Sequence, residues 1–201
     1  RENFAHPTRW ADAIETFTEQ DSENPPVKNA VLFVGSSSIV GWDTKKWFPE
    51  IDTINRGFGG SHIIDSWYYA ERIIIPYAPR TIVFYAGDND AADGKPPEMI
   101  FADFKAFALK IRSALPRTEL IYIAIKPSIA RWNIWPQMQE ANELIRRYCK
   151  QQKNMTFVDV STVMLDASGE PIRDIFVPDG LHMNEKGYAL WTALVRPLIE
   201  E

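Results

Sequence analysis

Two short motifs near opposite ends of this 201-residue sequence carry side chains that could act together on a carbonyl carbon. A glycine followed by three serines, residues 35–38, comes directly after an apolar run. Asp179 and His182 lie three positions apart before the last helical pattern, and in a turn that leads into a helix two such residues can face each other. A serine nucleophile, a histidine base and a carboxylate that orients the histidine are what acyl transfer from an ester requires.

Two other motifs could supply the hydrogen bonds that such a reaction also needs. Gly59 and Gly60 lie in a glycine-rich turn, and Asn89 lies in the polar segment 87–90. A glycine N–H and an asparagine side-chain NH₂ are neutral donors suited to an oxyanion. Each motif also has a structural interpretation, in which Gly60 permits a tight turn, Asn89 caps a loop and the serines begin a helix.

Other kinds of site can be tested against the same residues. The serine cluster could hold a phosphate at a helix start, but the glycine-rich fingerprints of nucleotide-binding loops are missing from the sequence, as is the nucleophile elbow Gly-x-Ser-x-Gly. The acidic segment 88–94 resembles a calcium loop, but its aspartates do not have EF-hand spacing. With three scattered histidines and a single cysteine, Cys149, no metal site is predicted.

The hydrophobic periodicity predicts short strands that alternate with helices. The strands are expected at residues 30–34, 53–55, 81–85, 120–125 and 156–160. The helices are expected at residues 10–20, 63–75, 97–115, 137–152 and 184–199, the last with Asn184 as its N-cap. This alternation predicts a five-stranded parallel sheet with helices on both faces, a three-layer α/β/α sandwich. Because ligands bind at the carboxyl ends of parallel strands, the polar motifs are expected to meet at one sheet edge.

Length and composition predict one globular domain over residues 1–201, in which residues 1–29 form an N-terminal helix and a lead-in segment. A net charge of −5 makes nucleic acid a poor candidate partner, and no apolar run is long enough to span a membrane. Because the sequence begins at Arg1, the compartment stays open: secreted or periplasmic if a signal peptide was removed, and otherwise cytoplasmic. The oligomeric state is open as well.

In their order along the chain, the four motifs resemble those of the SGNH hydrolases, the GDSL-type esterases and lipases. The resemblance extends from about residue 31 to the C-terminus. That family is named for a serine, a glycine, an asparagine and a histidine in four sequence blocks. The matching residues are Ser37 in the first block, Gly60 in the second, Asn89 in the third, and Asp179 and His182 in the fourth. The sequence departs from the family at Ser36, where aspartate is frequent, and this leaves open which serine attacks.

This resemblance implies a flavodoxin-like fold and a carboxylic ester hydrolase that needs neither a cofactor nor a metal. Ser37 would attack the ester carbonyl, His182 would carry its proton, and Asp179 would orient His182. The oxyanion would be held by the backbone N–H groups of Ser37 and Gly60 and by the side chain of Asn89.

The expected substrate is a small-molecule ester. Because the predicted loops are short, a large apolar lid is not expected, and the resemblance ranks short-acyl (acetyl) esters, including those of carbohydrates, above long-chain lipids. Residues at the predicted edge that could contact such a substrate are Trp42, His62, Arg131 and Trp132. Aromatic side chains beside an arginine suit sugars or small polar esters, although each tryptophan equally suits the margin of a core. His62, two residues after Gly60, could line the pocket, but a loop histidine is the favoured interpretation.

The competing hypothesis is a flavodoxin-like module that binds a ligand or nucleotide without hydrolysing anything. In that case residues 36–38 would hold a phosphate. This hypothesis leaves Asn89 and the Asp179–His182 pair without a role.

Overall fold

The computed structural model describes residues 7–200 and contains one parallel sheet with the strand order β2-β1-β3-β4-β5. The strands are β1 (Val31–Gly35), β2 (Thr53–Gly57), β3 (Thr81–Tyr85), β4 (Glu119–Ile123) and β5 (Met155–Val158). In the register, Val31 of β1 pairs with Thr53 on one side and with Thr81 on the other. The predicted five-stranded parallel sheet is confirmed.

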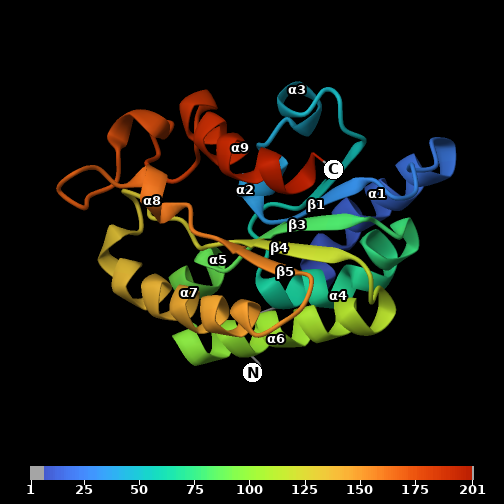
Figure 1. Cartoon of the computed structure of the whole chain (residues 1–201), viewed down its shortest axis with the longest axis horizontal. Coiled ribbons are helices and arrows are strands. Elements are labelled where there is room, and N and C mark those ends of the chain that lie inside the picture. Colours follow the sequence, from blue (N-terminus) through green and yellow to red (C-terminus); the bar gives the residue numbers. More distant parts are fainter. Residues whose placement is uncertain (1–6, 201) are drawn as a thin grey trace.

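Helices cover both faces of the sheet, as the predicted three-layer sandwich requires (Figure 1). The longer helices are α1 (Ala11–Glu23), α4 (Ile63–Ile73), α6 (Pro97–Ala114), α7 (Trp135–Lys150) and α9 (Glu185–Ile199). The shorter ones are α2 (Ser37–Val40), α3 (Thr44–Trp47), α5 (Asp88–Ala92) and α8 (Ser161–Met164). Single 3-10 turns lie at Pro7–Trp10, Ile75–Tyr77, Trp132–Ile134 and Arg173–Ile175. None of the helices within residues 7–200 has the length and apolar character needed to cross a membrane.

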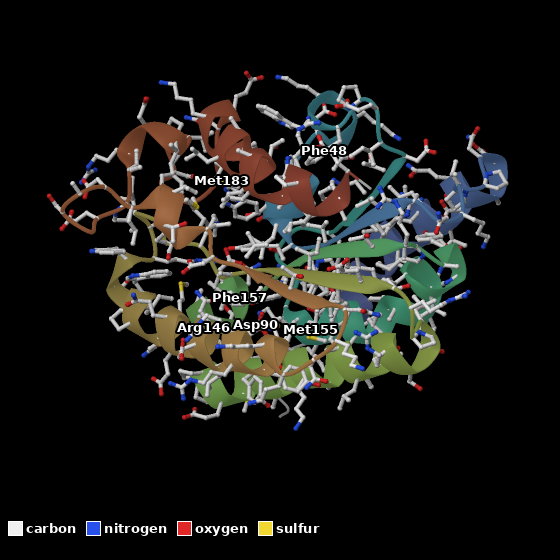
Figure 2. All side chains as sticks on the ribbon, viewed as in Figure 1. Phe48, Asp90, Arg146, Met155, Phe157 and Met183 are labelled. Atoms are coloured by element: carbon white, nitrogen blue, oxygen red, sulfur yellow. The ribbon has the colours of Figure 1, made fainter. Side chains whose placement is uncertain are left out.

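Two apolar layers form because successive strand residues point to opposite faces of a sheet. Leu32 of β1 packs with the apolar sides of α1, α4, α6 and α7, whereas Phe33 packs with α9 and the short helices α2 and α8. Figure 2 shows Phe48 and Met183 on the α9 side of the sheet and Asp90 on the other side. The sheet is therefore enclosed, and its carboxyl edge is where polar loops can gather.

The predicted elements are present, with ends displaced by a few residues. The helix expected at 63–75 ends at Ile73, because a 3-10 turn that contains Pro76 follows it. Asn184 is the N-cap of α9, as predicted, and its side chain accepts the backbone N–H of Lys186. Helices α3, α5 and α8 were not predicted, and α2 was considered only as a helix start at the serines, because four or five residues are too few to show a helical period.

The turn that follows β1 depends on Gly35. Its φ of +139° is one that side chains rarely permit, and a Cβ there would lie 1.8 Å from the carbonyl oxygen of Tyr85. The backbone N–H of Ser36 donates to the same carbonyl at 3.0 Å. This close approach of β1 to β3 turns the chain from the strand into α2 and brings the serines to the carboxyl edge of the sheet.

Candidate active site

Ser37, His182 and Asp179 form one hydrogen-bonded row at the carboxyl edge of the sheet. Ser37 Oγ is 3.0 Å from His182 Nε2, and His182 Nδ1 is 2.6 Å from Asp179 Oδ2. Ser37 is the first residue of α2, whereas the other two lie in the loop before α9. A hydroxyl bonded to an imidazole whose other nitrogen faces a carboxylate has the geometry that activates a serine.

The structure distinguishes Ser37 from its two neighbours. Ser36 and Ser38 are 0% and 1% exposed, and their hydroxyls form no hydrogen bond with the described residues. Ser37 is partly exposed, and its hydroxyl is the one that meets His182. A substrate could therefore reach Ser37 Oγ but not the other two hydroxyls.

The loop before α9 is built around the carboxylate of Asp179. Its Oδ1 accepts the backbone N–H of Leu181 at 2.8 Å and that of His182 at 2.9 Å. The bond to the His182 ring, with these two backbone bonds, lowers the pKa of Asp179 to about 2. The carboxylate is thus ionised at neutral pH and can accept the Nδ1 proton, which leaves the Nε2 lone pair of His182 for Ser37.

Gly59 and Gly60 lie in the loop after β2, beside Ser37. A Cβ built on Gly59 would lie 3.8 Å from Ser37 Cβ, so the backbone of this loop borders the serine side chain. Gly60 has a φ of +76°, a left-handed conformation that favours glycine. The indole N–H of Trp10 donates to the Gly59 carbonyl at 2.9 Å and ties the loop to the start of α1.

Asn89, in α5 after β3, is fixed in orientation by two partners. Its Nδ2 donates to the Ser61 carbonyl at 3.1 Å, and its Oδ1 accepts from Arg131 Nη2 at 2.9 Å. Because a carbonyl only accepts and a guanidinium only donates, turning the amide over would break both bonds. The bond to Ser61 also joins Asn89 to the residue after Gly60, so these two predicted donors belong to contacting segments.

Asp88, Lys126 and Arg131 form a buried ion-pair cluster that contacts Asn89. Asp88 Oδ2 is 3.1 Å from Lys126 Nζ and 3.0 Å from Arg131 Nη1. Asp88 Oδ1 accepts the backbone N–H of Asn89 at 3.0 Å. Burial raises the pKa of Asp88, but the positive charges of Lys126 and Arg131 outweigh burial and hold that pKa below its usual value. Asp88 therefore stays ionised in the interior.

A second buried cluster joins α5 to the start of α4. Asp90 Oδ1 is 2.7 Å from Lys95 Nζ, and Asp90 Oδ2 accepts the backbone N–H of Ile63 at 3.2 Å. His62 is 4% exposed, and its Nε2 is 2.9 Å from Asp93 Oδ2. The expectation that His62 lines a substrate pocket is corrected, because its ring is buried between α4 and α5. Within residues 7–200, no group of three or more histidine, cysteine or acidic side chains is placed to hold a metal ion.

The two tryptophans considered for substrate contact differ in exposure. Trp42 is 1% exposed, and its indole N–H donates to Thr192 Oγ1 at 3.1 Å inside the core. A side chain this buried cannot contact a substrate, so the expectation for Trp42 is wrong. Trp132 is partly exposed and stacks against Trp135 with ring centroids 6.0 Å apart.

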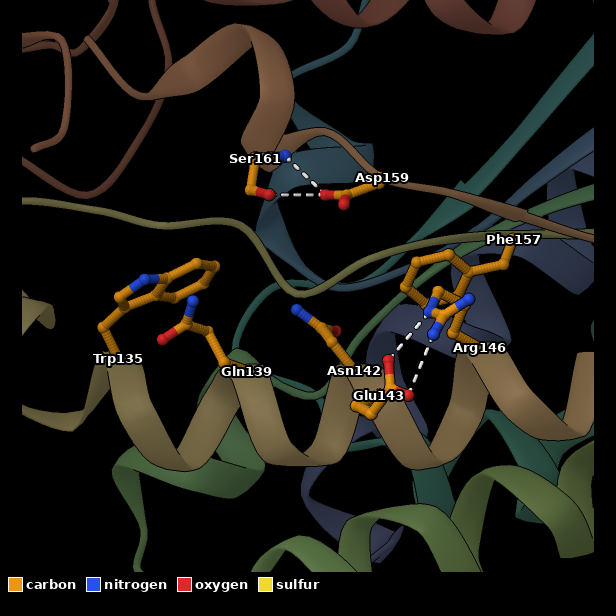
Figure 3. A pocket seen from close by; sticks show the side chains of 8 residues that line it. All are labelled: Trp135, Gln139, Asn142, Glu143, Arg146, Phe157, Asp159 and Ser161. Carbon is orange, nitrogen blue, oxygen red and sulfur yellow. Dashed lines mark hydrogen bonds and ion pairs between the residues drawn. The ribbon is translucent and has the colours of Figure 1, made fainter. Parts of the chain in front are cut away.

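A polar groove runs between α7 and the segment after β5, and its lining does not include the Ser37–His182–Asp179 row (Figure 3). Glu143 Oε2 accepts from Arg146 Nε at 2.8 Å on its α7 side, and Asp159 accepts the backbone N–H of Ser161 at 3.0 Å on the other. These charged groups are already paired within the groove. The groove therefore gives no support to a ligand site apart from the row.

Asp88 and Lys126, which form the buried cluster beside Asn89, are not among the site residues predicted from the sequence. The available signal was a charged residue, Lys126, directly after an apolar strand, since a buried cation needs a partner. Nothing in the sequence indicates which carboxylate that partner is. Arg131 was expected to contact substrate, but the structure directs its guanidinium to Asn89 and Asp88.

Comparisons with known proteins agree with this fold. A family model described as the GDSL-like Lipase/Acylhydrolase family matches residues 37–190, more than half of the chain. The chain is similar in structure to a candidate platelet activating factor from Streptococcus pneumonia, with a TM-score of 0.83 and 19% identity over 94% of this chain and 92% of the other. A GDSL-like lipase from Bacteroides thetaiotaomicron gives a TM-score of 0.80 and 23% identity over 98% of both chains. A variant of an acetyl-xylooligosaccharide esterase from Geobacillus Stearmophilus gives a TM-score of 0.68 and 14% identity over 88% of this chain and 96% of the other. None of the curated proteins compared with the chain matches it.

Proposed function

Because the chain belongs to the GDSL-like lipase/acylhydrolase family and is a carboxylic ester hydrolase, we propose that it cleaves short-acyl, chiefly acetyl, esters through Ser37, His182 and Asp179. The observation that carries this proposal is the continuous row from Ser37 Oγ through His182 to Asp179, with separations of 3.0 and 2.6 Å. The serine that the family motif indicates is also the accessible one.

The reaction proceeds in two halves through an acyl-enzyme. Ser37 Oγ attacks the ester carbonyl carbon while His182 Nε2 takes the hydroxyl proton. Collapse of the tetrahedral intermediate breaks the bond to the alcohol oxygen, and the alcohol leaves with the proton from His182. Water then attacks the acyl-Ser37 ester and gives a proton to His182, which returns it to Ser37 Oγ as the carboxylic acid leaves. Asp179 stays ionised throughout and stabilises the imidazolium.

The negative charge on the carbonyl oxygen is held by the backbone N–H groups of Ser37 and Gly60 and by the side chain of Asn89. An asparagine amide has two hydrogens, and among the described residues Asn89 Nδ2 donates only to Ser61, at 3.1 Å. The other hydrogen is available to the oxyanion. Donors fixed in advance stabilise the transition state without reorganising, and removing one typically costs about 10²–10³ in kcat.

The exposure of the site supports a short acyl group. The side chains of His182 and Asp179 are 42% and 46% exposed, so the row lies at the surface. A long acyl chain gains about 0.8 kcal/mol for each CH₂ that it buries, and a surface site offers little to bury it against. The likeness to an acetyl-xylooligosaccharide esterase supports an acetylated carbohydrate as the substrate class, and Trp132, the partly exposed residue after Arg131, is the proposed aromatic contact.

A phosphate-binding module remains the weaker interpretation of the serine cluster. The hydroxyls of Ser36 and Ser38 are buried, and that of Ser37 faces His182. The family match is to hydrolases.

A fluorophosphonate probe tests the proposed nucleophile directly. The labelled peptide is expected to contain Ser37, and Ser37→Ala should abolish labelling and lower turnover of p-nitrophenyl acetate by about 10⁴-fold or more. Ser36→Ala and Ser38→Ala serve as matched controls that keep both signals, with circular dichroism as the check on folding. Labelling of Ser36 or Ser38, with Ser37→Ala still active, would contradict the assignment.

A further inference from the structure

The contacts of Arg131 point to a role in orienting the Asn89 amide. We propose that Arg131 is a positioning residue, which holds the Asn89 side chain so that its NH₂ end, not its oxygen, faces the reacting carbonyl. This inference rests on the proposed function, because it concerns the donor that Asn89 supplies to the oxyanion.

The guanidinium of Arg131 uses both of its terminal nitrogens within the protein. Nη2 donates to Asn89 Oδ1 at 2.9 Å, and Nη1 lies 3.0 Å from Asp88 Oδ2. The planar guanidinium loses its freedom once two partners fix it. If the Asn89 amide were turned over, its oxygen would repel the developing oxyanion and would also lose its bond to Arg131. Arg131 and the Ser61 carbonyl together therefore determine which end of the amide is presented, Arg131 by holding the oxygen and Ser61 by accepting from the nitrogen.

Arg131 is in turn held by a buried anchor. Asp88 Oδ2 bridges Arg131 and Lys126, and the Lys126 side chain is 1% exposed. Asp88 Oδ1 accepts the backbone N–H of Asn89 at 3.0 Å. One carboxylate thus fixes both the backbone of Asn89 and the arginine that fixes its side chain.

The loop that carries Arg131 also contacts the loop that carries the base. The backbone N–H of Ala130 donates to the Gly180 carbonyl at 3.0 Å. A Cβ on Gly180, whose φ is +66°, would lie 3.1 Å from Ile129 Cβ, so the two loops are closely packed. Because Gly180 follows Asp179, the segment 129–131 contacts both the histidine loop and Asn89. This segment can therefore hold His182 and Asn89 at a fixed position relative to each other.

Substitution at Arg131 separates positioning from substrate binding. Arg131→Met removes both contacts, Arg131→Lys keeps a cation beside Asp88, and Arg147→Met removes an arginine on α7 that is 68% exposed, as a matched control. We expect Arg131→Met to lower kcat for p-nitrophenyl acetate by about 10- to 100-fold with KM nearly unchanged. Arg131→Lys should recover part of this loss. Arg147→Met should match the wild type. A rise in KM with kcat unchanged would overturn positioning and restore substrate contact.

A double-mutant cycle tests whether Arg131 acts through Asn89. In an Asn89→Ala background there is no amide left to orient, so Arg131→Met should cause no further loss of kcat. Losses that multiply would overturn the proposal, because they would show that Arg131 acts independently of Asn89. Thermal unfolding of each variant identifies any that fails to fold.

The side-chain amide of Asn89 provides a readout that does not depend on turnover. In ¹⁵N-labelled protein its NH₂ signal, assigned by its loss in Asn89→Ala, should shift or broaden in Arg131→Met and not in Arg147→Met. An unchanged signal in Arg131→Met would overturn the proposal. If wild-type protein were neither labelled at Ser37 nor active on esters, the proposed function would fail while the amide signal still reported on Arg131.

Discussion

Ser37 Oγ and His182 Nε2 lie 3.0 Å apart although 145 positions separate them in the sequence. β1 ends at Gly35, two residues before Ser37, and the loop before α9 brings His182 to the same edge of the sheet. Such meetings at the carboxyl edge are a consequence of parallel strand order. The proposed chemistry depends on this contact, since it is what turns a serine hydroxyl into a nucleophile.

Asp179→Asn should lower kcat by about 10⁴-fold and leave the fold intact. The amide still fits the turn, but it cannot hold the His182 tautomer that accepts the Ser37 proton. Steady-state hydrolysis of p-nitrophenyl acetate, with circular dichroism, checks this. Wild-type activity in Asp179→Asn would show that His182 is oriented by other groups.

Asn89→Ala should lower kcat by about 10²–10³-fold with little change in KM. The amide is expected to bind the oxyanion, which exists only in the transition state and the intermediate. Kinetics across a substrate concentration series separate the two constants. A change confined to KM would make Asn89 a binding or structural residue instead.

Activity across acyl chain lengths should peak at the short end. The reason is that the exposed row of Ser37, His182 and Asp179 gives a long acyl chain little apolar surface to bury against. The measurement is kcat/KM for acetyl, butyryl, octanoyl and palmitoyl esters of one alcohol. A steady rise toward octanoyl or palmitoyl would favour a lipase.

Trp132→Ala should raise KM for an acetylated sugar more than for a small aryl acetate. A sugar extends farther from the ester than a small aryl group does, so only the sugar is expected to reach the partly exposed ring of Trp132. The aryl acetate is the internal control for damage to the row. Equal effects on both substrates would leave Trp132 as a packing residue against Trp135.

The contribution of the Asp88–Lys126 ion pair to the free energy of unfolding should depend on pH. Because the pKa of Asp88 is lower in the folded state than its usual value, the ion pair stabilises the fold above about pH 3.9, and this contribution is lost as the pH falls through the folded-state pKa. Lys126→Met should therefore cost up to about 3 kcal/mol of unfolding free energy at pH 7 and less at pH 3. Urea unfolding at both pH values measures this, with the exposed Lys150→Met as control. An equal cost at both pH values would mean that Lys126 acts by packing alone.

The fold was largely predictable because its signals are local. Residues 81–85 were predicted as a strand and form β3 with the same bounds, since a continuous apolar run needs no distant partner to be recognised. The N-cap at Asn184 was found because capping depends on the residue and the helix that follows it. The motifs likewise showed which kinds of side chain would reach the carboxyl edge.

The sequence by itself determined the strand and helix pattern and the types of group at that edge, because both are properties of short segments. Only the tertiary structure decided that Ser37 is accessible while Ser36 is buried, and that Trp42 belongs to the core. It also decided that Arg131 bonds Asn89 rather than standing open to a substrate. This contact depends on β3 lying beside β4, which brings the loops after both strands together. Burial and pairing are properties of segments distant in sequence that meet in space, so no short stretch of the chain contains them.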